Sequence, residues 1–416
     1  MGPRSSLLGW PRRLLHVSGY IFAAKLARRL SVGLDDLDRL NFDLLRAIAR
    51  HKLPRGVFDY IDRGAEDEVG LRHNRQAFDS VRLVPRALVD ISSRSQQVEL
   101  FGRTFASPLI AAPAAAIGLV WHRGEIPLAQ AAREANIAFC AATESIMRVE
   151  DIVETGVKPW FQLYVWNDRA ITWRLVERVR DLGIDVLVVT VDAVTPPKRE
   201  YNAHNGFDVP LKATLRGAVD IATHPGWVLK VLLPYLRRGG MPELGNYPAG
   251  YRSRITKGKI SDAVKITGTF DWAGFAELRR RWKGPLVIKG ILHPDDAVKA
   301  ADLGADGIVV SNHGARDLDS AAAPIEMLPR IADACGNRLV VLADSSIRRG
   351  SDVVKLLASG ARAAMVGRAF LYGTAAAGQT GARAAIAMLS DEIWRTMGLL
   401  GCRSLGEIGP QLIYKP

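Results

Sequence analysis

The sequence has few cysteines and no long uninterrupted apolar run. Only three of its 416 residues are cysteine, and Cys140, Cys335 and Cys402 are spaced too widely for a metal-binding or disulfide pattern. Cys140 lies within the apolar run from Ile137 to Ala142, so we expect it to be a small core residue. This cysteine usage fits a reducing, cytoplasmic compartment and predicts no metal site. No apolar run reaches the roughly 18 residues that a membrane-spanning helix needs, so we expect a soluble or peripherally attached protein.

Acidic residues are fewer than basic ones, and the deficit lies in two segments of the chain. Lys and Arg outnumber Asp and Glu by 56 to 43, which gives a formal net charge of +13. Residues 1–34 carry six Lys or Arg and no acid, and residues 211–260 carry nine against two acids, so these two segments hold the whole excess. Nucleic-acid binding predicts basic residues interleaved with stacking aromatics in a recognisable module, and we find neither. Two basic segments that also carry apolar residues favour an anionic membrane surface, with solvated basic loops as the alternative.

Residues 1–38 precede any regular pattern, and we expect them to form a basic leader. Basic residues interrupt every apolar run in this stretch, so the apolar region of a secretory signal is missing. An amphipathic membrane anchor, a transit-like segment and a disordered leader all remain open.

Short apolar runs alternate with helical patterns from about residue 100 onward, which is typical of repeated βα units around a parallel sheet. Helices are expected at Ile126–Ala135, Ile171–Leu182 and Asp295–Leu303. Strands this continuously apolar are buried on both faces, as in a closed barrel. We therefore predict one α/β unit at residues 39–416, a (β/α)8 TIM barrel with an N-terminal helical extension. Its eight strands are expected at Leu109–Ala112, Ala138–Ala141, Trp160–Leu163, Val186–Thr190, Leu286–Lys289, Gly307–Ser311, Leu339–Ala343 and Ala363–Val366.

A long insertion separates the fourth and fifth predicted strands. Nearly a hundred residues intervene, and a structureless loop of that length would argue against the strand assignment unless it had a function. Its middle, Trp227–Arg238, is an apolar run that ends in a basic pair. We predict that residues 211–262 form an excursion from the barrel, which either packs locally as a lid or contacts a membrane.

Polar side chains follow nearly every predicted strand. TIM barrels place their chemistry at these carboxyl ends, so the side chains are expected to face one barrel mouth. The loops after the seventh and eighth strands often bind phosphate through backbone N–H groups and a helix N-terminus. Here those loops contain Arg348, Gly367 and Arg368, which would add charge and permit close backbone approach.

Several motifs, taken together, resemble one enzyme family. They are Lys52–Tyr60, Gly64–Asp67, Trp160–Tyr164, Thr190–Asp192, Val287–Gly290 and Ser311–Arg316. The chain resembles the FMN-dependent α-hydroxy-acid dehydrogenase/oxidase family, which contains glycolate oxidase, L-lactate dehydrogenase and mandelate dehydrogenase. The resemblance runs from about Asn41 to Leu405.

The resemblance implies that the cofactor is FMN and suggests its contacts. Lys289 would lie near the flavin N1/O2 region, where a cation stabilises the negative charge of reduced flavin. Gln162 and Thr190 would hydrogen-bond the isoalloxazine edge. The other implied cofactor contacts are Pro113, Ala114, Ala115, Thr143, Ser311, Asp344, Arg348, Gly367 and Arg368.

The resemblance also implies the catalytic groups. His313 would be the base, with Asp192 on its other ring nitrogen to fix the tautomer and stabilise the imidazolium. The C2 hydrogen would leave either as a proton or as a hydride. The substrate-binding residues would be Arg199 and Arg316, which match the family's carboxylate clamp, and Tyr60 and Tyr164, which would contact the carboxylate and the 2-hydroxyl.

We therefore expect FMN-dependent oxidation of an L-2-hydroxy acid to the 2-oxo acid. Small residues at 114–116 favour an aromatic or long-chain substrate. The basic, apolar insertion favours a quinone or another respiratory carrier as electron acceptor, at the inner face of a membrane, and we expect a homo-oligomer. The alternatives are an oxidase that uses oxygen and makes peroxide, a flavin-binding barrel with a repurposed substrate site, and a phosphate-binding barrel that catalyses a non-redox isomerisation.

Overall fold

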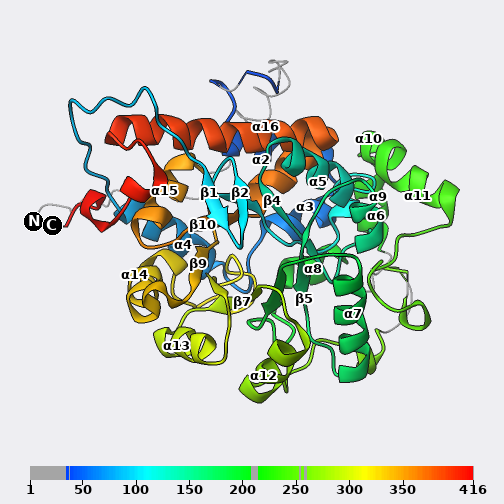
Figure 1. The fold of residues 1–416 in the computed structure, drawn as a ribbon. Helices are drawn as coiled ribbons and strands as arrows, with labels where there is room; N and C mark the ends of the chain where they lie inside the picture. The colour runs from blue at the N-terminus through cyan, green and yellow to red at the C-terminus, as the bar shows by residue number, and fades with distance from the viewer. Residues whose placement is uncertain (1–33, 37, 208–213, 253, 257–259, 416) are drawn as a thin grey trace, which may run out of the picture.

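The eight predicted strands form a closed parallel barrel. The computed structural model describes residues 34–36, 38–207, 214–252, 254–256 and 260–415 (Figure 1). The strands pair in the cyclic order β10-β3-β4-β5-β6-β7-β8-β9, so the predicted TIM barrel is confirmed. Their bounds are β3 Leu109–Ala111, β4 Ala138–Ala142, β5 Trp160–Leu163, β6 Leu187–Thr190, β7 Leu286–Ile291, β8 Gly307–Val310, β9 Val340–Ala343 and β10 Ala363–Val366.

The barrel interior is filled by apolar side chains. Alternate strand residues such as Ile110, Cys140, Trp160 and Met365 pack together in it, each at most 1% exposed. The antiparallel hairpin of β1 (Val98–Leu100) and β2 (Arg103–Phe105) adds buried side chains to the same cluster. All three cysteines are buried and unpaired, and Cys140 is the core residue that the sequence predicts.

Amphipathic helices cover the outside of the barrel. In α7, Asp168 caps the N-terminus by accepting hydrogen bonds from the N–H groups of Ala170 and Ile171, and apolar residues from Ile171 to Val179 are buried at helical spacing. The three helices predicted from periodicity are found, shifted by one or two residues. The covering helices are α5 Glu125–Glu134, α6 Val149–Val153, α7 Arg169–Asp181, α12 Trp272–Arg281, α13 Pro294–Asp302, α14 Pro324–Cys335, α15 Gly350–Ala358 and α16 Arg368–Leu400.

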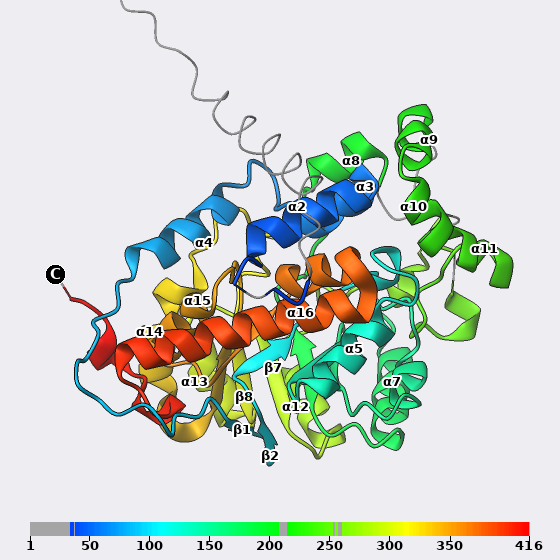
Figure 2. The ribbon, with the colours of Figure 1, turned by 90° about the horizontal axis from the view of Figure 1, so that it is seen from above.

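An N-terminal group of helices lies over α16, as the predicted helical extension requires (Figure 2). It consists of α2 (Phe42–Lys52), α3 (Arg55–Asp62) and α4 (Val69–Ser80). Helix α2 packs on α16, and Arg46 forms an ion pair of 2.5 Å with the buried Asp62 of α3. Tyr372 of α16 also donates to Asp62, so this carboxylate ties the extension to the barrel.

The segment between β6 and β7 has one face packed and one face exposed. It contains α8 (Glu200–Asn205), α9 (Leu215–Ala222), α10 (Pro225–Trp227), the π-helical turn Val228–Leu232 and α11 (Leu233–Arg238). The Trp227 indole donates to the carbonyl of Leu119 at 2.8 Å, and the Tyr235 hydroxyl accepts from the N–H of Arg123 at 2.9 Å. These bonds anchor the excursion on the loop after β3. Helix α9 buries none of its residues.

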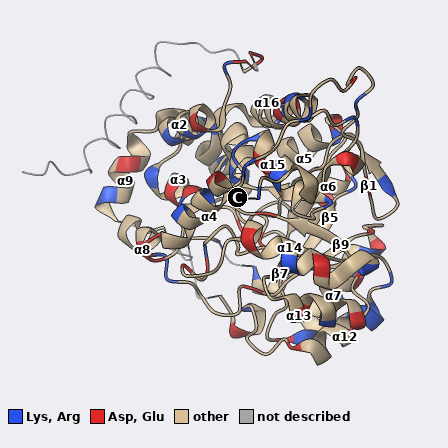
Figure 3. Ribbon diagram, turned by 90° about the vertical axis from the view of Figure 1, so that its left-hand side faces the viewer, with Lys and Arg blue, Asp and Glu red and all other residues tan. Residues whose placement is uncertain are grey.

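Most of the predicted leader lies outside the described residues; only 34–36 and 38 fall within them. In the part of the chain that the structure describes, no helix combines the length and the apolar character needed to cross a membrane. On the face drawn in Figure 3, basic and acidic residues are interspersed over the helices.

Gly290 shapes the end of β7, where the strand pairing with β8 shifts register. Its φ is +106°, and a Cβ built there would lie 2.6 Å from the Cβ of Asp192. We expect Gly290→Ala to lower the free energy of unfolding by about 1–3 kcal/mol or more. The alanine would be strained at a positive φ, and its Cβ would clash with the Cβ of Asp192.

Thermal unfolding followed by circular dichroism measures this effect. Gly250→Ala is the matched control, because a Cβ there would meet open space. Equal unfolding midpoints for the two variants would contradict the assigned constraint.

Candidate active site

One cavity opens at the carboxyl ends of the barrel strands. It has a volume of about 840 Å³ and is lined by residues that follow the strands, together with side chains from α2, α3 and the excursion. This is the size range of a cofactor or ligand pocket. Strand pairing brings residues distant in sequence to the rim, since Ala142 pairs with Gln162 and Thr190 pairs with Lys289.

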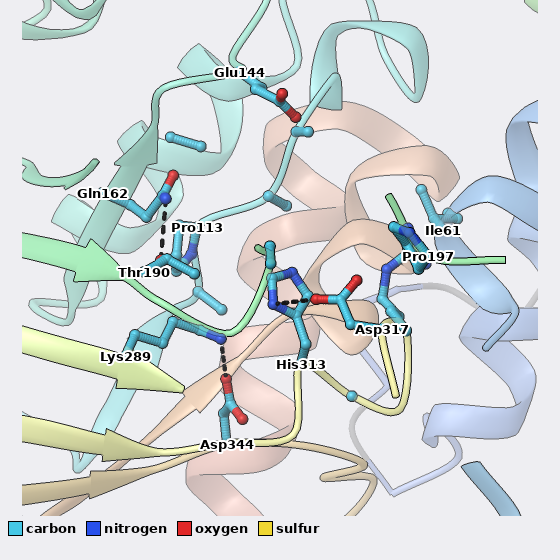
Figure 4. A pocket seen from close by; sticks show the side chains of 18 of the residues that line it. Ile61, Pro113, Glu144, Gln162, Thr190, Pro197, Lys289, His313, Asp317 and Asp344 are labelled. Carbon is cyan, nitrogen blue, oxygen red and sulfur yellow. Dashed lines mark hydrogen bonds and ion pairs between the residues drawn. The ribbon is translucent and has the colours of Figure 1, made fainter. Parts of the chain in front are cut away.

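His313 stands in the cavity wall with two carboxylates on one ring nitrogen. Its Nδ1 lies 2.9 Å from Asp192 Oδ1 and 3.1 Å from Asp317 Oδ2. Figure 4 shows Asp317 next to the ring, in the loop that also carries His313. Burial alone would raise the pKa of Asp192, but His313 and Lys289 outweigh it and hold that pKa below its usual range.

The ionised carboxylates define how the imidazole can act. A carboxylate only accepts hydrogen bonds, so Nδ1 must carry a proton toward Asp192. In the neutral ring Nε2 is then the atom with a lone pair, and it hydrogen-bonds to none of the described residues. The arrangement fits a general base that takes a proton at Nε2, while the carboxylates at Nδ1 stabilise the protonated ring.

Two arginines line the same part of the cavity. Arg199 donates to the carbonyl of Arg316 at 3.1 Å and pairs with Asp317 at 3.0 Å. Arg316 donates to the carbonyls of Tyr60 and Arg63. Burial, together with the positive charges of Arg199 and Arg368, lowers the pKa of Arg316. A concentration of half-buried cations of this kind is stabilised by an anion, and a planar carboxylate matches the guanidinium fork.

Two tyrosines complete this side of the cavity. Burial raises the pKa of Tyr60, and burial and nearby acids raise the pKa of Tyr164 well above its ordinary value. Both phenols therefore stay protonated at neutral pH and are hydrogen-bond donors.

Another side of the cavity carries a buried lysine. Lys289 Nζ lies 3.1 Å from Asp344 Oδ2 and donates to Ser311 Oγ at 2.9 Å (Figure 4). Burial opposes its charge, but Asp344 and Asp192 raise the pKa of Lys289, so the ammonium is retained. Next to it, Gln162 donates to Thr190 Oγ1 at 3.0 Å. This wall therefore presents a fixed positive charge, an amide and a hydroxyl. Such groups can bind the polar edge of a ring-shaped ligand.

The loops after β9 and β10 form an anion-binding corner. Helix α16 begins at Arg368, directly after Gly367, so its first N–H groups lie at the cavity. Arg348 and Ser346 line the same region, and Ser346 Oγ is buried without a hydrogen-bond partner in the described residues. An unsatisfied hydroxyl beside arginines and a helix N-terminus fits a phosphate group. The residues present therefore fit a phosphorylated ring cofactor such as FMN.

Most of the predicted site residues line this one cavity. They are Tyr60, Pro113, Ala114, Ala115, Gln162, Tyr164, Thr190, Arg199, Lys289, His313, Arg316, Asp344, Arg348, Gly367 and Arg368. Three stand behind the wall instead. Asp192 orients His313, Ser311 holds Lys289, and the Thr143 hydroxyl donates to the carbonyl of Gln162 at 2.7 Å.

Sequence reasoning missed two acids of the cavity wall. Asp317 directly follows Arg316, and Glu144 directly follows Thr143 at the end of β4. Each could have been found as a charged residue at a strand end or in the loop that follows it.

Comparison with known proteins gives a consistent result. The family model described as FMN-dependent dehydrogenase matches residues 49–415. The chain is 37% identical over 374 residues to (S)-mandelate dehydrogenase of Pseudomonas putida, covering 90% of this chain and 93% of the relative. It is 42% identical over 376 residues to an L-lactate dehydrogenase of Xanthomonas euvesicatoria, covering 89% and 95%.

Solved structures agree in fold. A crystal structure of the monotopic membrane protein (S)-mandelate dehydrogenase superposes with a TM-score of 0.84 at 36% identity, covering 91% of this chain and 100% of that one. A mandelate oxidase variant with (S)-mandelic acid gives a TM-score of 0.75 at 34% identity, covering 90% and 97%. Similar structures thus include both a dehydrogenase and an oxidase.

Proposed function

This chain belongs to the family of FMN-dependent dehydrogenases, and we propose that it oxidises an L-2-hydroxy acid with His313 as the base and delivers the electrons at a membrane surface. The family and its relatives make it an FMN-dependent oxidoreductase that acts on 2-hydroxy acids. The proposal concerns the residue roles, the acceptor and the membrane. The observation that carries it is the convergence of His313, Arg199 and Arg316 on one cavity.

When bound, FMN supplies a two-electron acceptor. Arg199 and Arg316 bind and orient the substrate carboxylate, and the phenols of Tyr60 and Tyr164 donate hydrogen bonds to the carboxylate and the 2-hydroxyl. His313 Nε2 takes a proton from the substrate, and Asp192 stabilises the resulting imidazolium through Nδ1. Lys289 keeps a fixed positive charge on the cofactor's side of the cavity, and Arg348, Arg368 and the start of α16 hold the phosphate.

The exposed face of the excursion supports a membrane role. Leu215, Val219, Leu229 and Leu236 are 48–85% exposed and lie on α9, the π-helical turn and α11. These elements gather at one end of the molecule in both Figure 1 and Figure 2. Exposed basic residues accompany them, namely Arg216, Lys230, Arg237 and Arg238. An apolar face edged by cations is suited to the headgroup region of an anionic bilayer.

The acceptor follows from the same surface. The excursion lines the cavity through Tyr247 and Ile260 while its other face is apolar and exposed. A lipid-soluble carrier such as a quinone could therefore approach the site from the bilayer, so we propose a quinone as acceptor. The expected homo-oligomer stays a prediction.

Replacing His313 tests the assigned base. Anaerobic addition of L-2-hydroxy acids should bleach the visible flavin band of the purified wild-type protein. His313→Ala should keep the flavin and bleach about 10²–10⁴-fold more slowly, because the proton acceptor is gone. Stopped-flow absorbance measures both rates. Undiminished bleaching by the variant would refute the role of His313, and a wild-type flavin that no such acid bleaches would refute the proposed substrate class.

Replacing Arg199 tests the carboxylate clamp. Arg199→Lys should raise KM about tenfold or more, because a point charge cannot replace two parallel hydrogen bonds to a carboxylate. Steady-state kinetics measures the change. Lys198→Arg is the control, because Lys198 is the exposed neighbour and lies outside the cavity lining. Similar KM values for Arg199→Lys and the wild type would exclude Arg199 from substrate binding.

Charge placed on the apolar face tests the membrane and the acceptor together. The double variant Leu229→Glu, Leu236→Glu should bind anionic vesicles at least about tenfold more weakly, because each leucine loses its burial in lipid. Its turnover with a water-soluble dye should be unchanged, while turnover with a vesicle-embedded quinone should fall. Flotation assays and dye or quinone reduction measure these effects.

Leu399→Glu is the matched control, since Leu399 is 75% exposed at the far end of α16. Unchanged vesicle binding by the double variant would move the membrane contact elsewhere in the chain. Stoichiometric release of peroxide from oxygen, without quinone reduction, would replace the proposed acceptor by oxygen.

A further inference from the structure

The cavity wall contains a carboxylate that the proposed reaction does not use. Glu144 follows the end of β4 and lines the cavity. Figure 4 shows its side chain on the side of the cavity away from Lys289 and Asp344. The charged groups that act on it most strongly are Arg199, His313 and Asp317, which belong to the substrate side of the site. Glu144 therefore faces the substrate and not the cofactor phosphate.

Glu144 differs from the other acids of the site in having no cation beside it. Asp192 lies 2.9 Å from His313, Asp344 lies 3.1 Å from Lys289, and Asp317 lies 3.0 Å from Arg199. Among the ion pairs of the described residues, none within 4.0 Å includes the Glu144 carboxylate, and Arg199 and His313 act on it from farther away. Tyr247 lies nearby. Burial raises the pKa of Glu144, and the more distant charges of Arg199 and His313 oppose this shift.

Glu144 forms no ion pair with the groups that bind the reacting end of the substrate, although Arg199 and His313 act on it from a distance. Arg199 and Arg316 take the carboxylate, and His313 faces the 2-hydroxyl carbon. The substituent on that carbon must extend along the remaining wall, where Ala114 and Ala115 leave room. An isolated carboxylate on this wall repels an anionic substituent and loses hydration against an apolar one, but a cationic substituent supplies its missing partner.

We propose that Glu144 selects the side chain of the substrate, and that the preferred substrate is an L-2-hydroxy acid whose side chain ends in a cationic nitrogen, an ammonium or guanidinium. This inference rests on the proposed function, because it takes the carboxylate clamp and His313 as the fixed end of the substrate. Glu144 acts on the distal end, so it determines which acid is bound and takes no part in the proton transfer.

Three acids of similar length test the proposal. They are L-2-hydroxyhexanoate, its 6-amino derivative and L-2-hydroxyadipate, which end in a methyl group, an ammonium and a carboxylate. The rate constant of flavin reduction divided by the apparent dissociation constant should be about ten- to a hundredfold higher for the ammonium acid than for the neutral one, as a charge-assisted hydrogen bond predicts. The dicarboxylate should be the poorest of the three.

Glu144→Gln should abolish this ranking. The amide keeps the shape of the side chain but removes the charge, so the ammonium acid should lose its advantage while the neutral acid is reduced at least as well as before. Flavin content should be unchanged. Glu277→Gln is the control, because Glu277 is paired with Arg281 on α12 outside the cavity and the ranking should survive there.

A binding measurement keeps the inference separate from the reaction. The three acids are titrated into the flavin-loaded His313→Ala protein, and the shift of the flavin spectrum gives their dissociation constants without turnover. The same ranking should appear. Equal affinities for the ammonium and neutral acids, or a preference that persists in Glu144→Gln, would overturn the assignment of Glu144. A failure of all three acids to reduce wild-type flavin, with the binding order retained, would instead overturn the proposed reaction.

Discussion

Closure of the barrel is the constraint from which the site follows. Each of the eight strands is buried on both faces, inside against the filled interior and outside against the helices. Polar side chains within a strand would lose hydration without a partner. They are therefore confined to the strand ends, and because the strands are parallel, those ends share one rim. The convergence of residues as distant in sequence as Gln162 and Asp344 is a consequence of this closure.

Placing many ionisable groups in one cavity requires that their charges be balanced. Lys289 is almost fully buried, and its charge is kept by Asp344 and Asp192. Asp192 in turn stays ionised because Lys289 and His313 stand beside it. A lone buried ion would change its protonation state, whereas these linked pairs hold theirs. Two places without a balancing ion pair remain, the cations around Arg316 and the partly exposed carboxyl of Glu144. Both lie on the substrate side, so a substrate with a negative head and a positive tail would balance both.

The strands and most site residues could be predicted because their signals are local. Continuous apolar runs bounded by polar residues predict all eight strands and place Gln162, Lys289 and His313 at strand ends, while the family resemblance implies their roles. Other features depend on contacts that no pattern contains. The family resemblance predicts a cofactor contact for the Thr143 hydroxyl. In the structure this hydroxyl donates its hydrogen bond to the carbonyl of Gln162 on the neighbouring strand. Asp317 was missed because its role depends on a turn with positive φ at His313 and Ala315, which brings the acid back to the ring. Among the described residues Glu144 forms no ion pair, and this depends on the three-dimensional arrangement, which a sequence does not show.

The sequence leaves two interpretations of the excursion open, a packed lid and a membrane contact. It does not show which residues of the segment face the barrel. Trp227 and Tyr235 bond to the loop after β3 and Val231 is buried, so the inner face packs as a lid would. The outer residues Leu215 and Leu229 are 85% and 62% exposed. Exposed apolar side chains that gather over neighbouring elements are typical of a surface that contacts a partner or a membrane. The packed inner face and the exposed outer face thus lie on opposite sides of one segment, and membrane contact by the outer face stays a proposal.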